Sequence, residues 1–209
     1  MSSIKNIIFD LGGVLLNIDY GKTEAAFETL GFHHFDQMYT QYMSDPIFAE
    51  LEQGFLAEDS FYDRIMPATK QPVTKTQIKE AWNAMLLDFR EESLSLLEKL
   101  SQHYKLYLLS NTNAIHLEAF NKLFTAQTGK PSLDVYFTKA WYSHIVGLRK
   151  PNVDIYEFVL KDAGLVAGET LFIDDSYNNI DGAKAVGLQT HLLLPGESIE
   201  HLDYFARVI

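Results

Sequence analysis

The sequence predicts an α/β fold in which a doubly wound parallel sheet carries an inserted helical cap. Three observations predict it: short continuous apolar runs, amphipathic helical patterns that alternate with these runs, and one long segment in which helical spacing prevails. Continuous apolar runs are typical of parallel strands that are buried on both faces. Strand and helix patterns that alternate along a chain indicate a parallel sheet covered by helices on both sides.

Four apolar runs predict the central strands. Each is rich in Ile, Leu, Phe or Tyr and has the length of a buried strand. The runs cover residues 4–9, 105–109, 170–173 and 189–194. A fifth segment, residues 135–142, mixes polar and apolar residues, which favours a strand nearer the edge of the sheet.

Helical patterns separate the later strands. In each pattern the apolar residues recur on one face at helical spacing. Pro151 precedes one of the patterns at a position that suits the first turn of a helix. The patterns cover residues 92–103, 115–124, 153–163 and 178–186.

Residues 19–88 differ from the rest of the chain. They are rich in Phe, Tyr, Met, Glu and Gln at helical spacing, and they contain no convincing strand. We therefore predict a helical cap at residues 19–88, inserted into a core made of residues 1–18 and 89–209. The helical spacing is clearest at residues 25–30, 35–43 and 78–86.

The net charge limits the partners of the protein. The formal charge is −11, with acids and bases mixed along the chain. Such a field repels nucleic acid and anionic membranes, so we expect neither as a partner. It also repels a phosphorylated ligand, so a phosphate site needs local positive charge from lysine, arginine, a metal ion or a helix N-terminus.

The chain contains no cysteine, which excludes disulfides, thiolate catalysis and cysteine-ligated zinc. It shows neither a signal-peptide pattern nor an apolar stretch long enough to span a membrane. We therefore expect a cytoplasmic protein. A monomer and a homodimer are both compatible with the sequence.

Asp10 directly follows the first predicted strand and precedes Gly12 and Gly13. Ligands of open α/β sheets bind at the carboxyl ends of the strands, and glycines let a backbone approach a ligand closely. An aspartate at this edge is well placed to act as a nucleophile or as a metal ligand. Taken alone, Asp10 is equally compatible with a solvated residue that opens a turn.

Two further motifs offer groups that bind phosphate. Ser110 and Asn111 follow the strand at residues 105–109, where a hydroxyl and a helix N-terminus can hold an anion. Both residue types are also favoured as helix N-caps. Arg149 and Lys150 stand before a predicted helix and could offset phosphate charge, whereas an isolated pair of surface cations is commonly solvated.

Asp174 and Asp175 follow the predicted strand at residues 170–173. Consecutive carboxylates at a strand end repel each other unless a cation neutralises them. Oxygen ligands without His or Cys nearby favour a hard ion such as Mg²⁺. A capping aspartate beside a solvated one is the alternative. Together the motifs place an acid, a hydroxyl, a lysine and paired acids after successive strands, so we expect them to converge at one edge of the sheet.

The four motifs, in this order, resemble the haloacid dehalogenase superfamily of phosphohydrolases over the whole chain. The resemblance implies a Rossmann-like core, a cap after the first strand and a small phosphorylated metabolite, such as a sugar phosphate, as substrate. It implies that Asp10 is the nucleophile and forms an aspartyl-phosphate. It also implies that Ser110 binds the phosphoryl group and that Lys150 stabilises the phosphoryl oxygens and the nucleophile.

The same resemblance implies Mg²⁺ as cofactor. Its ligands would be Asp10, the backbone carbonyl of Gly12 and the acidic pair Asp174 and Asp175. We further expect three residues to contact the phosphate, namely Asn111, Gly12 and Gly13.

One position departs from the family pattern. Most phosphatases of the family have a second aspartate, a general acid and base, where this chain has Gly12. The residues around it resemble a subgroup that includes bacterial phosphatases of α-glucose 1-phosphate and the phosphatase-like N-terminal domain of epoxide hydrolases. A cap residue such as Glu52, a water molecule or Asp19 could supply the missing proton.

Two other functions are compatible with the motifs. A 2-haloacid dehalogenase also uses an aspartate nucleophile without the second acid, but it has no use for the pair Asp174 and Asp175. A relative that binds a phosphorylated ligand without turnover has no need of the complete set of motifs.

Overall fold

A parallel sheet lies at the centre of the protein, in the computed structural model that describes residues 3–32, 35, 39, 45–69 and 71–206. Within these residues it has five strands in the order β5-β4-β1-β6-β7. The strands are β1 (Asn6–Phe9), β4 (Lys105–Ser110), β5 (Lys139–Tyr142), β6 (Thr170–Asp174) and β7 (Gln189–Leu192). This arrangement confirms the predicted fold class.

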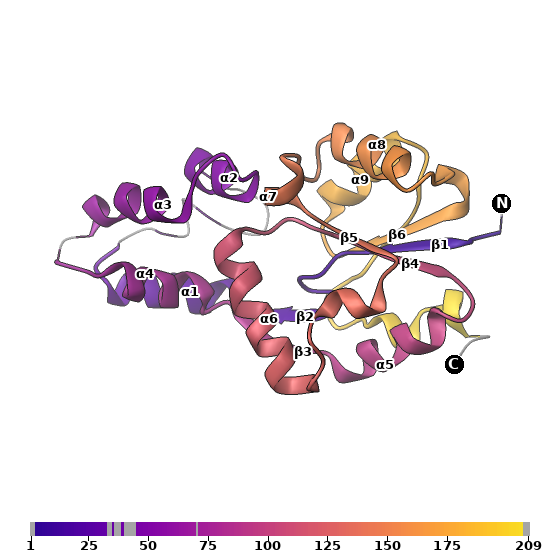
Figure 1. Ribbon diagram of the computed structural model, residues 1–209, viewed down its shortest axis with the longest axis horizontal. Coiled ribbons are helices and arrows are strands. Elements are labelled where there is room, and N and C mark those ends of the chain that lie inside the picture. Colours follow the sequence, from indigo (N-terminus) through magenta and orange to yellow (C-terminus); the bar gives the residue numbers. More distant parts are fainter. Residues whose placement is uncertain (1–2, 33–34, 36–38, 40–44, 70, 207–209) are drawn as a thin grey trace.

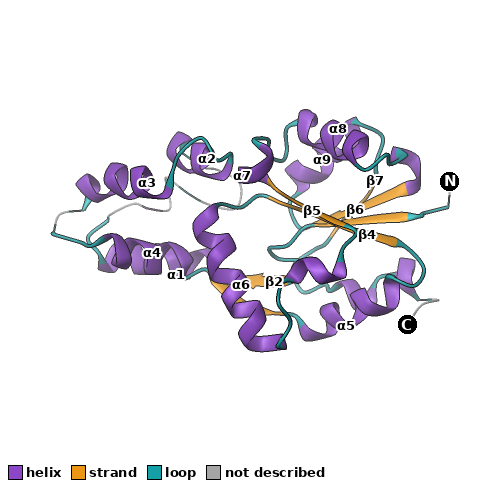
Figure 2. Cartoon of the chain, viewed as in Figure 1, coloured by secondary structure: helices purple, strands orange, loops and turns teal. Residues whose placement is uncertain are grey.

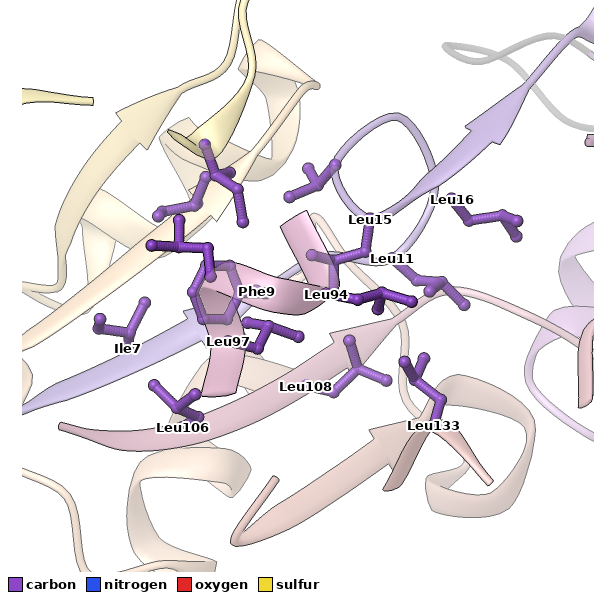
Figure 3. Packing of buried hydrophobic residues seen from close by; sticks show 14 of the residues in the cluster. Ile7, Phe9, Leu11, Leu15, Leu16, Leu94, Leu97, Leu106, Leu108 and Leu133 are labelled. Atoms are coloured by element: carbon purple, nitrogen blue, oxygen red, sulfur yellow. The ribbon is translucent and has the colours of Figure 1, made fainter. Parts of the chain in front are cut away.

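Helices cover both faces of the sheet, because neighbouring residues of each strand point to opposite sides. Ile7 and Phe9 of β1 pack with the leucines of α5 (Figure 3). Ile8, in contrast, lies in the cluster formed with α8 and α9. Figure 2 shows α8 and α9 on one side of the sheet and α5 on the other. The helices are α5 (Glu91–Leu100), α6 (Ala114–Thr128), α8 (Val153–Asp162) and α9 (Tyr177–Ala185).

The predicted strand at residues 135–142 is shorter in the structure. Leu133–Tyr136 forms a 3-10 helix, and β5 begins only at Lys139. Ser132 caps this short helix by accepting a hydrogen bond from the Asp134 backbone N–H at 3.1 Å. β5 lies at one edge of the sheet, as its mixed composition predicted.

A second, two-stranded sheet was not predicted. β2 (Leu16–Ile18) pairs antiparallel with β3 (Leu86–Phe89). The expectation that residues 19–88 contain no strand is therefore wrong at their C-terminal end. The apolar spacing at residues 78–86 concealed the boundary, because it runs from helix α4 through Ala84 and Met85 into the first residue of β3.

Between β2 and β3 lies a set of helices that we call the helical insert. It contains α1 (Tyr20–Thr29), α2 (Pro46–Glu52), α3 (Glu58–Ile65) and α4 (Lys75–Asn83). The predicted helix at residues 35–43 lies mostly outside the described residues. Side chains define the starts of three helices: Asp19 caps α1, Asp45 caps α2, and Thr74 with Gln77 forms a capping box at α4.

The helical insert has its own hydrophobic cluster. Phe27, Phe48, Phe61 and Trp82 are fully buried in it, and Ile115 of α6 also belongs to it, so the insert packs against α6. Figure 1 shows the insert beside the sheet, with α6 next to α4 and α1. No helix in the described part of the chain is both long and apolar enough to cross a membrane.

The packing of α9 against the loop before α8 gives a prediction. A Cβ on Gly182 would lie 2.3 Å from the carbonyl oxygen of Pro151. In a helix interior alanine is more favourable than glycine by about 1 kcal/mol. Here we nevertheless expect Gly182→Ala to lower the free energy of unfolding by about 1–3 kcal/mol, because the added methyl group would overlap with the backbone of Pro151. Denaturant unfolding measures the change.

The matched control is Gly21→Ala. Gly21 is an exposed helical glycine whose added Cβ would meet only Asp19 Oδ1, at 3.2 Å. We expect this variant to keep the stability of the unmodified protein or to exceed it. Equal changes in the two variants would contradict the packing explanation.

Candidate active site

The predicted polar residues meet at the carboxyl edge of three neighbouring strands. β1 lies between β4 and β6, so Asp10 after β1, Ser110 at the end of β4 and Asp174 at the end of β6 are brought together. Lys150 comes from the loop after α7 (Ser143–Val146). Its Nζ lies 2.7 Å from Asp10 Oδ1 and 2.6 Å from Asp174 Oδ2.

Lys150 is an ammonium group enclosed between two carboxylates. Only 1% of Lys150 is exposed, and Asp174 is fully buried. Burial alone lowers the pKa of Lys150, but Asp10 and Asp174 outweigh it and hold that pKa above its usual value. Lys150 therefore stays charged. A lysine can stabilise anionic oxygens only in this form.

The carboxylates of this site carry more negative charge than Lys150 neutralises. Burial raises the pKa of Asp10 to about 7, and Asp174 and Asp175 add to this effect while Lys150 opposes it. Burial and the neighbouring Asp174 raise the pKa of Asp175 to about 6. The cluster is thus electrostatically costly in its ionised form.

Asp174 is fixed by hydrogen bonds on both of its oxygens. Oδ1 accepts from the Ser176 backbone N–H at 2.8 Å and from Asn179 Nδ2 at 3.0 Å, and Oδ2 accepts from Lys150. Asp175, in contrast, lines the cavity described below. The two acids of the pair therefore differ: Asp174 orients Lys150, and Asp175 faces the ligand space.

Asn111 holds Lys150 from the side of β4. Its Oδ1 accepts from the Lys150 backbone N–H and its Nδ2 donates to the Lys150 carbonyl, both at 2.9 Å. Both polar groups of the Asn111 side chain are thus engaged in positioning the lysine. A contact of Asn111 with phosphate stays a prediction, as does the role of Ser110, which is buried and lines the cavity.

The two glycines after Asp10 have different surroundings. Gly12 lines the cavity, and its backbone is not in the left-handed region. Gly13 has φ 73° and donates its N–H to the Leu16 carbonyl at 2.8 Å. A Cβ on Gly13 would lie 2.1 Å from Asp175 Oδ2, so glycine is required here for the close approach of Asp175.

Three carboxylates could hold a metal ion. Asp10, Asp174 and Asp175 each offer an oxygen, and these oxygens lie within 4.8 Å of one another. Together they have a formal excess of two negative charges over Lys150, which matches a divalent cation. A donor set of oxygens without His or Cys suits a hard ion such as Mg²⁺.

A cavity of about 430 Å³ opens above these groups. Asp10, Ser110, Lys150 and Asp175 line its floor. Its walls come from both parts of the protein, and they include Tyr20, Tyr39 and Glu52 of the insert region and His116 and Arg149 of the rest.

Glu52 and Arg149 join the two parts across the cavity wall. Arg149 Nη2 lies 2.8 Å from Glu52 Oε2, and the Tyr39 hydroxyl donates to Glu52 Oε1 at 3.0 Å. Burial raises the pKa of Glu52, and Arg149 and Tyr39 oppose that rise. The sequence suggested Arg149 as a residue that could offset the charge of a phosphate, but in the structure Arg149 is paired with the carboxylate of Glu52.

The turn after α2 packs against α7. Gln53 Nε2 donates to the Gly147 carbonyl at 3.4 Å. Gly54 has φ 73°, and a Cβ on it would lie 2.1 Å from the His144 carbonyl oxygen. This close contact places Glu52 on the cavity wall, next to the loop that carries Lys150.

Sequence reasoning missed two residues of the site region. Asn179 binds Asp174, and His116 lines the cavity. The sequence contains no feature that distinguishes His116 from the other six histidines, all of which are typical of surface or core positions. Its position before Leu117 and Phe120 in an amphipathic pattern gives no signal of a cavity.

Comparison with known proteins relates this geometry to a family. A family model of haloacid dehalogenase-like hydrolases matches residues 4–187. The chain is 36% identical over 188 residues to the D-ribitol-5-phosphate phosphatase of Bacteroides thetaiotaomicron, and the alignment covers 90% of each chain.

Solved structures agree with this match. An aspartate-to-alanine variant of a haloacid dehalogenase family enzyme from Bacteroides thetaiotaomicron, in complex with magnesium and inorganic phosphate, superimposes with a TM-score of 0.89. It shares 35% identity, and the alignment covers 95% of this chain and 98% of that chain. The L-2-haloacid dehalogenase of Xanthobacter autotrophicus shares the fold alone, with 19% identity, a TM-score of 0.58 and coverage of 91% and 77%.

The excess negative charge of the carboxylate cluster predicts how the stability of the Asp10→Asn variant depends on pH when no metal is bound. The pKa of Asp10 is 3.8 ordinarily and about 7 in the folded protein. The folded state therefore binds more protons than the unfolded state in this window, and the Asp10 charge lowers stability as the pH rises. We expect Asp10→Asn to melt at a higher temperature than the unmodified protein at pH 8, with a smaller difference at pH 5.

Excess Mg²⁺ provides the control for this comparison. A bound divalent cation stabilises the unmodified protein by mass action, so the advantage of Asp10→Asn should shrink or reverse. An advantage that is the same at pH 5 and pH 8 would show that the Asp10 charge is not its cause.

Proposed function

The chain belongs to the haloacid dehalogenase-like hydrolases, and we propose that it is a Mg²⁺-dependent phosphatase of a small sugar or polyol phosphate. The observation that carries the proposal is the buried contact between Lys150 Nζ and Asp10 Oδ1 at the floor of the cavity. It supports the proposal because the carboxylate that we propose as the nucleophile, Asp10, lies next to a fixed positive charge and an acidic cluster. The similarity to a D-ribitol-5-phosphate phosphatase supports a sugar or polyol phosphate as substrate.

Asp10 performs the covalent step in this proposal. Lys150 holds Oδ1 and so orients the carboxylate, and the other oxygen attacks phosphorus. The bond between phosphorus and the oxygen of the alcohol breaks, and an aspartyl-phosphate forms on Asp10. Water then attacks the phosphorus, releases inorganic phosphate and restores the Asp10 carboxylate.

Lys150 and Ser110 stabilise the phosphoryl oxygens during both steps. Lys150 is already desolvated and held in place by Asn111 and Asp174, so little reorganisation is needed when charge develops. Asp10, the Gly12 carbonyl and Asp175 would hold Mg²⁺, with Asp174 beside them, and the ion would neutralise phosphoryl charge.

We also propose that residues 19–88 act as a cap over a core of residues 1–18 and 89–209. Three features support it: the separate hydrophobic cluster of the helical insert, the ion pair of Glu52 with Arg149, and the position of Tyr39 on the cavity wall. A cap in this place encloses the leaving group and excludes bulk water from the nucleophile.

Water supplies the proton to the leaving group in our proposal. Asp19 accepts a hydrogen bond from the Gly21 backbone N–H at 3.0 Å and so serves as the cap of α1. Glu52 is paired with Arg149. Both carboxyl groups that the sequence suggested as proton donors thus have other partners.

Hydrolysis of phosphate esters tests the proposed function. A panel of sugar phosphates, polyol phosphates and p-nitrophenyl phosphate should release inorganic phosphate in the presence of Mg²⁺. Asp10→Asn should abolish release, because an amide does not attack phosphorus. Phosphate release by a folded Asp10→Asn variant that is free of deamidation would remove Asp10 from the nucleophile role.

Removal of metal separates the phosphatase from the dehalogenase reaction. We expect EDTA to abolish phosphate release and Mg²⁺ in excess to restore it. Asp175→Asn should require more Mg²⁺ for half-maximal activity, since it removes a carboxylate from the cavity side of the cluster. Full activity in EDTA, or halide release from a 2-haloacid, would contradict the proposal.

Gly12→Asp tests the missing general acid. Gly12 has room for a side chain, because its φ is not positive and an added Cβ meets only the Ile18 side chain, at 3.2 Å. We expect Gly12→Asp to raise kcat on alkyl and sugar phosphates by about tenfold or more, since general acid catalysis contributes about 10²–10⁴-fold. The activity on p-nitrophenyl phosphate, whose phenolate leaves without a proton, should change much less.

Gly12→Asn is the matched control, because it has the same shape and no acidic proton. It should produce no gain on either substrate. A gain of equal size in both variants, or on both substrates, would show that Gly12 does not limit proton transfer.

A further inference from the structure

One ion pair on the cavity wall places an arginine within reach of a ligand. Arg149 Nη2 lies 2.8 Å from Glu52 Oε2, and both residues line the cavity. The Arg149 side chain is 24% exposed, whereas the Glu52 side chain is 5% exposed. Nε of Arg149 is buried, but neither of its Nη nitrogens is among the buried side-chain atoms that lack a hydrogen bond. The end of the guanidinium group is therefore the part of this pair that a ligand can approach.

Glu52 is held beside Arg149 by its surroundings. The Tyr39 hydroxyl donates to Glu52 Oε1 at 3.0 Å. The next two residues, Gln53 and Gly54, pack closely against α7, and Figure 1 shows α2 beside α7. A carboxylate fixed in this way does not move aside when a ligand enters, so Arg149 stays neutralised.

The other charged residues of the cavity do not attract a second anionic group. Among the described residues that line it, Lys150 is the one lysine or arginine besides Arg149, and it is paired with Asp10 and Asp174. Asp10 and Asp175 add negative charge at the floor. The net charge of the Glu52–Arg149 pair therefore decides whether the wall attracts an anionic leaving group.

We propose that Glu52 is a specificity-determining residue whose carboxylate cancels the charge of Arg149 and so makes the cavity select phosphate esters with an uncharged leaving group. The inference rests on the proposed phosphatase function and names the residue that restricts its substrates. A second phosphate or a carboxylate on the leaving group has to compete with Glu52 for Arg149 and is repelled by the Glu52 charge. An uncharged leaving group that carries hydroxyls meets neither obstacle.

Three variants change the net charge of the pair in a defined way. Glu52→Gln leaves one positive charge on the wall, Arg149→Gln leaves one negative charge, and the double variant is neutral, as the unmodified pair is. The matched control is Glu50→Gln. Glu50 lies in the same helix, α2, and pairs with Arg64 at 2.7 Å, but it is not among the described residues that line the cavity. Its substitution changes the total charge of the protein by the same amount as Glu52→Gln.

The substrates are esters that differ in one terminal group. They are hydroxyl-terminated alkyl phosphates and carboxylate-terminated alkyl phosphates of the same chain lengths, assayed with Mg²⁺. A series of lengths is needed because the terminal group has to reach Arg149 while the phosphate lies at Asp10. The measured quantity is the kcat/KM for the carboxylate ester divided by that for the hydroxyl ester. This ratio is independent of any loss that a variant causes on both substrates.

We expect the unmodified protein to favour the hydroxyl ester. Glu52→Gln should raise the ratio by about tenfold or more at the chain length that reaches Arg149, the effect of a hydrogen bond to a charged group. Added salt should reduce this gain, because it screens the attraction. Arg149→Gln should lower the ratio, and the double variant should return it close to that of the unmodified protein. Glu50→Gln should leave it unchanged.

A purely structural role of the ion pair predicts a different result. It predicts lower melting temperatures and equal losses on both esters, and an unchanged ratio in Glu52→Gln would overturn the inference. An equal rise in Glu50→Gln, or a preference of the unmodified protein for the carboxylate ester, would also overturn it. If Glu52→Gln does not fold, Arg149→Gln and the double variant still decide, because the ratio must fall in the first and recover in the second. If the unmodified protein hydrolyses neither these esters nor p-nitrophenyl phosphate with Mg²⁺, the proposed function itself fails.

Discussion

The site depends on one interaction, the enclosure of the Lys150 ammonium between Asp10 and Asp174. A buried charge is tolerated only when it is paired and hydrogen-bonded, and the removal of one partner leaves another charge unpaired. The lysine is far from both aspartates in sequence, so the contact requires β1 and β6 to be neighbours. Asn111, from the end of β4, completes the enclosure by binding the Lys150 backbone. Residues at the ends of three adjacent strands thus hold one lysine, two by its side chain and one by its backbone.

The same enclosure explains why the site lowers the stability of the folded protein when no metal is bound. Asp10 and Asp175 both have raised pKa values because they are buried beside further carboxylates. Gly13 makes this crowding possible, since any side chain there would collide with Asp175. Local conflicts of this kind are expected where function outweighs stability. The free energy stored in the charge excess becomes available for binding a divalent cation.

The sequence predicted the central strands and the convergence of Asp10, Ser110, Lys150 and Asp174 well, because both follow from local signals at the strand ends. A continuous apolar run that ends in Asp10 or in Asp174 shows the strand and the site together. It did not reveal the pair of β2 and β3, because both strands are short and the whole helical insert separates them in sequence. Nor did it reveal that His116 is buried where α6 meets the insert, because this position depends on contacts with Asn83 and Trp82, two residues of another element. Contacts between elements leave no periodic pattern in either segment.

The sheet edge and the helical insert contribute different residues to the lining of the cavity. The groups at the floor come from the sheet edge and from the Lys150 loop, where the enclosure allows little variation. Two polar contacts near the cavity walls, Glu52 with Arg149 and His116 with Asn83, each join the helical insert to the rest of the chain. The first is a closed ion pair with no net charge, and in the second His116 Nε2 is buried without a hydrogen-bond partner among the described residues. Both contacts lie away from the Asp10–Lys150 contact at the sheet edge, so the junction between the two parts and the carboxylate cluster are built from different residues.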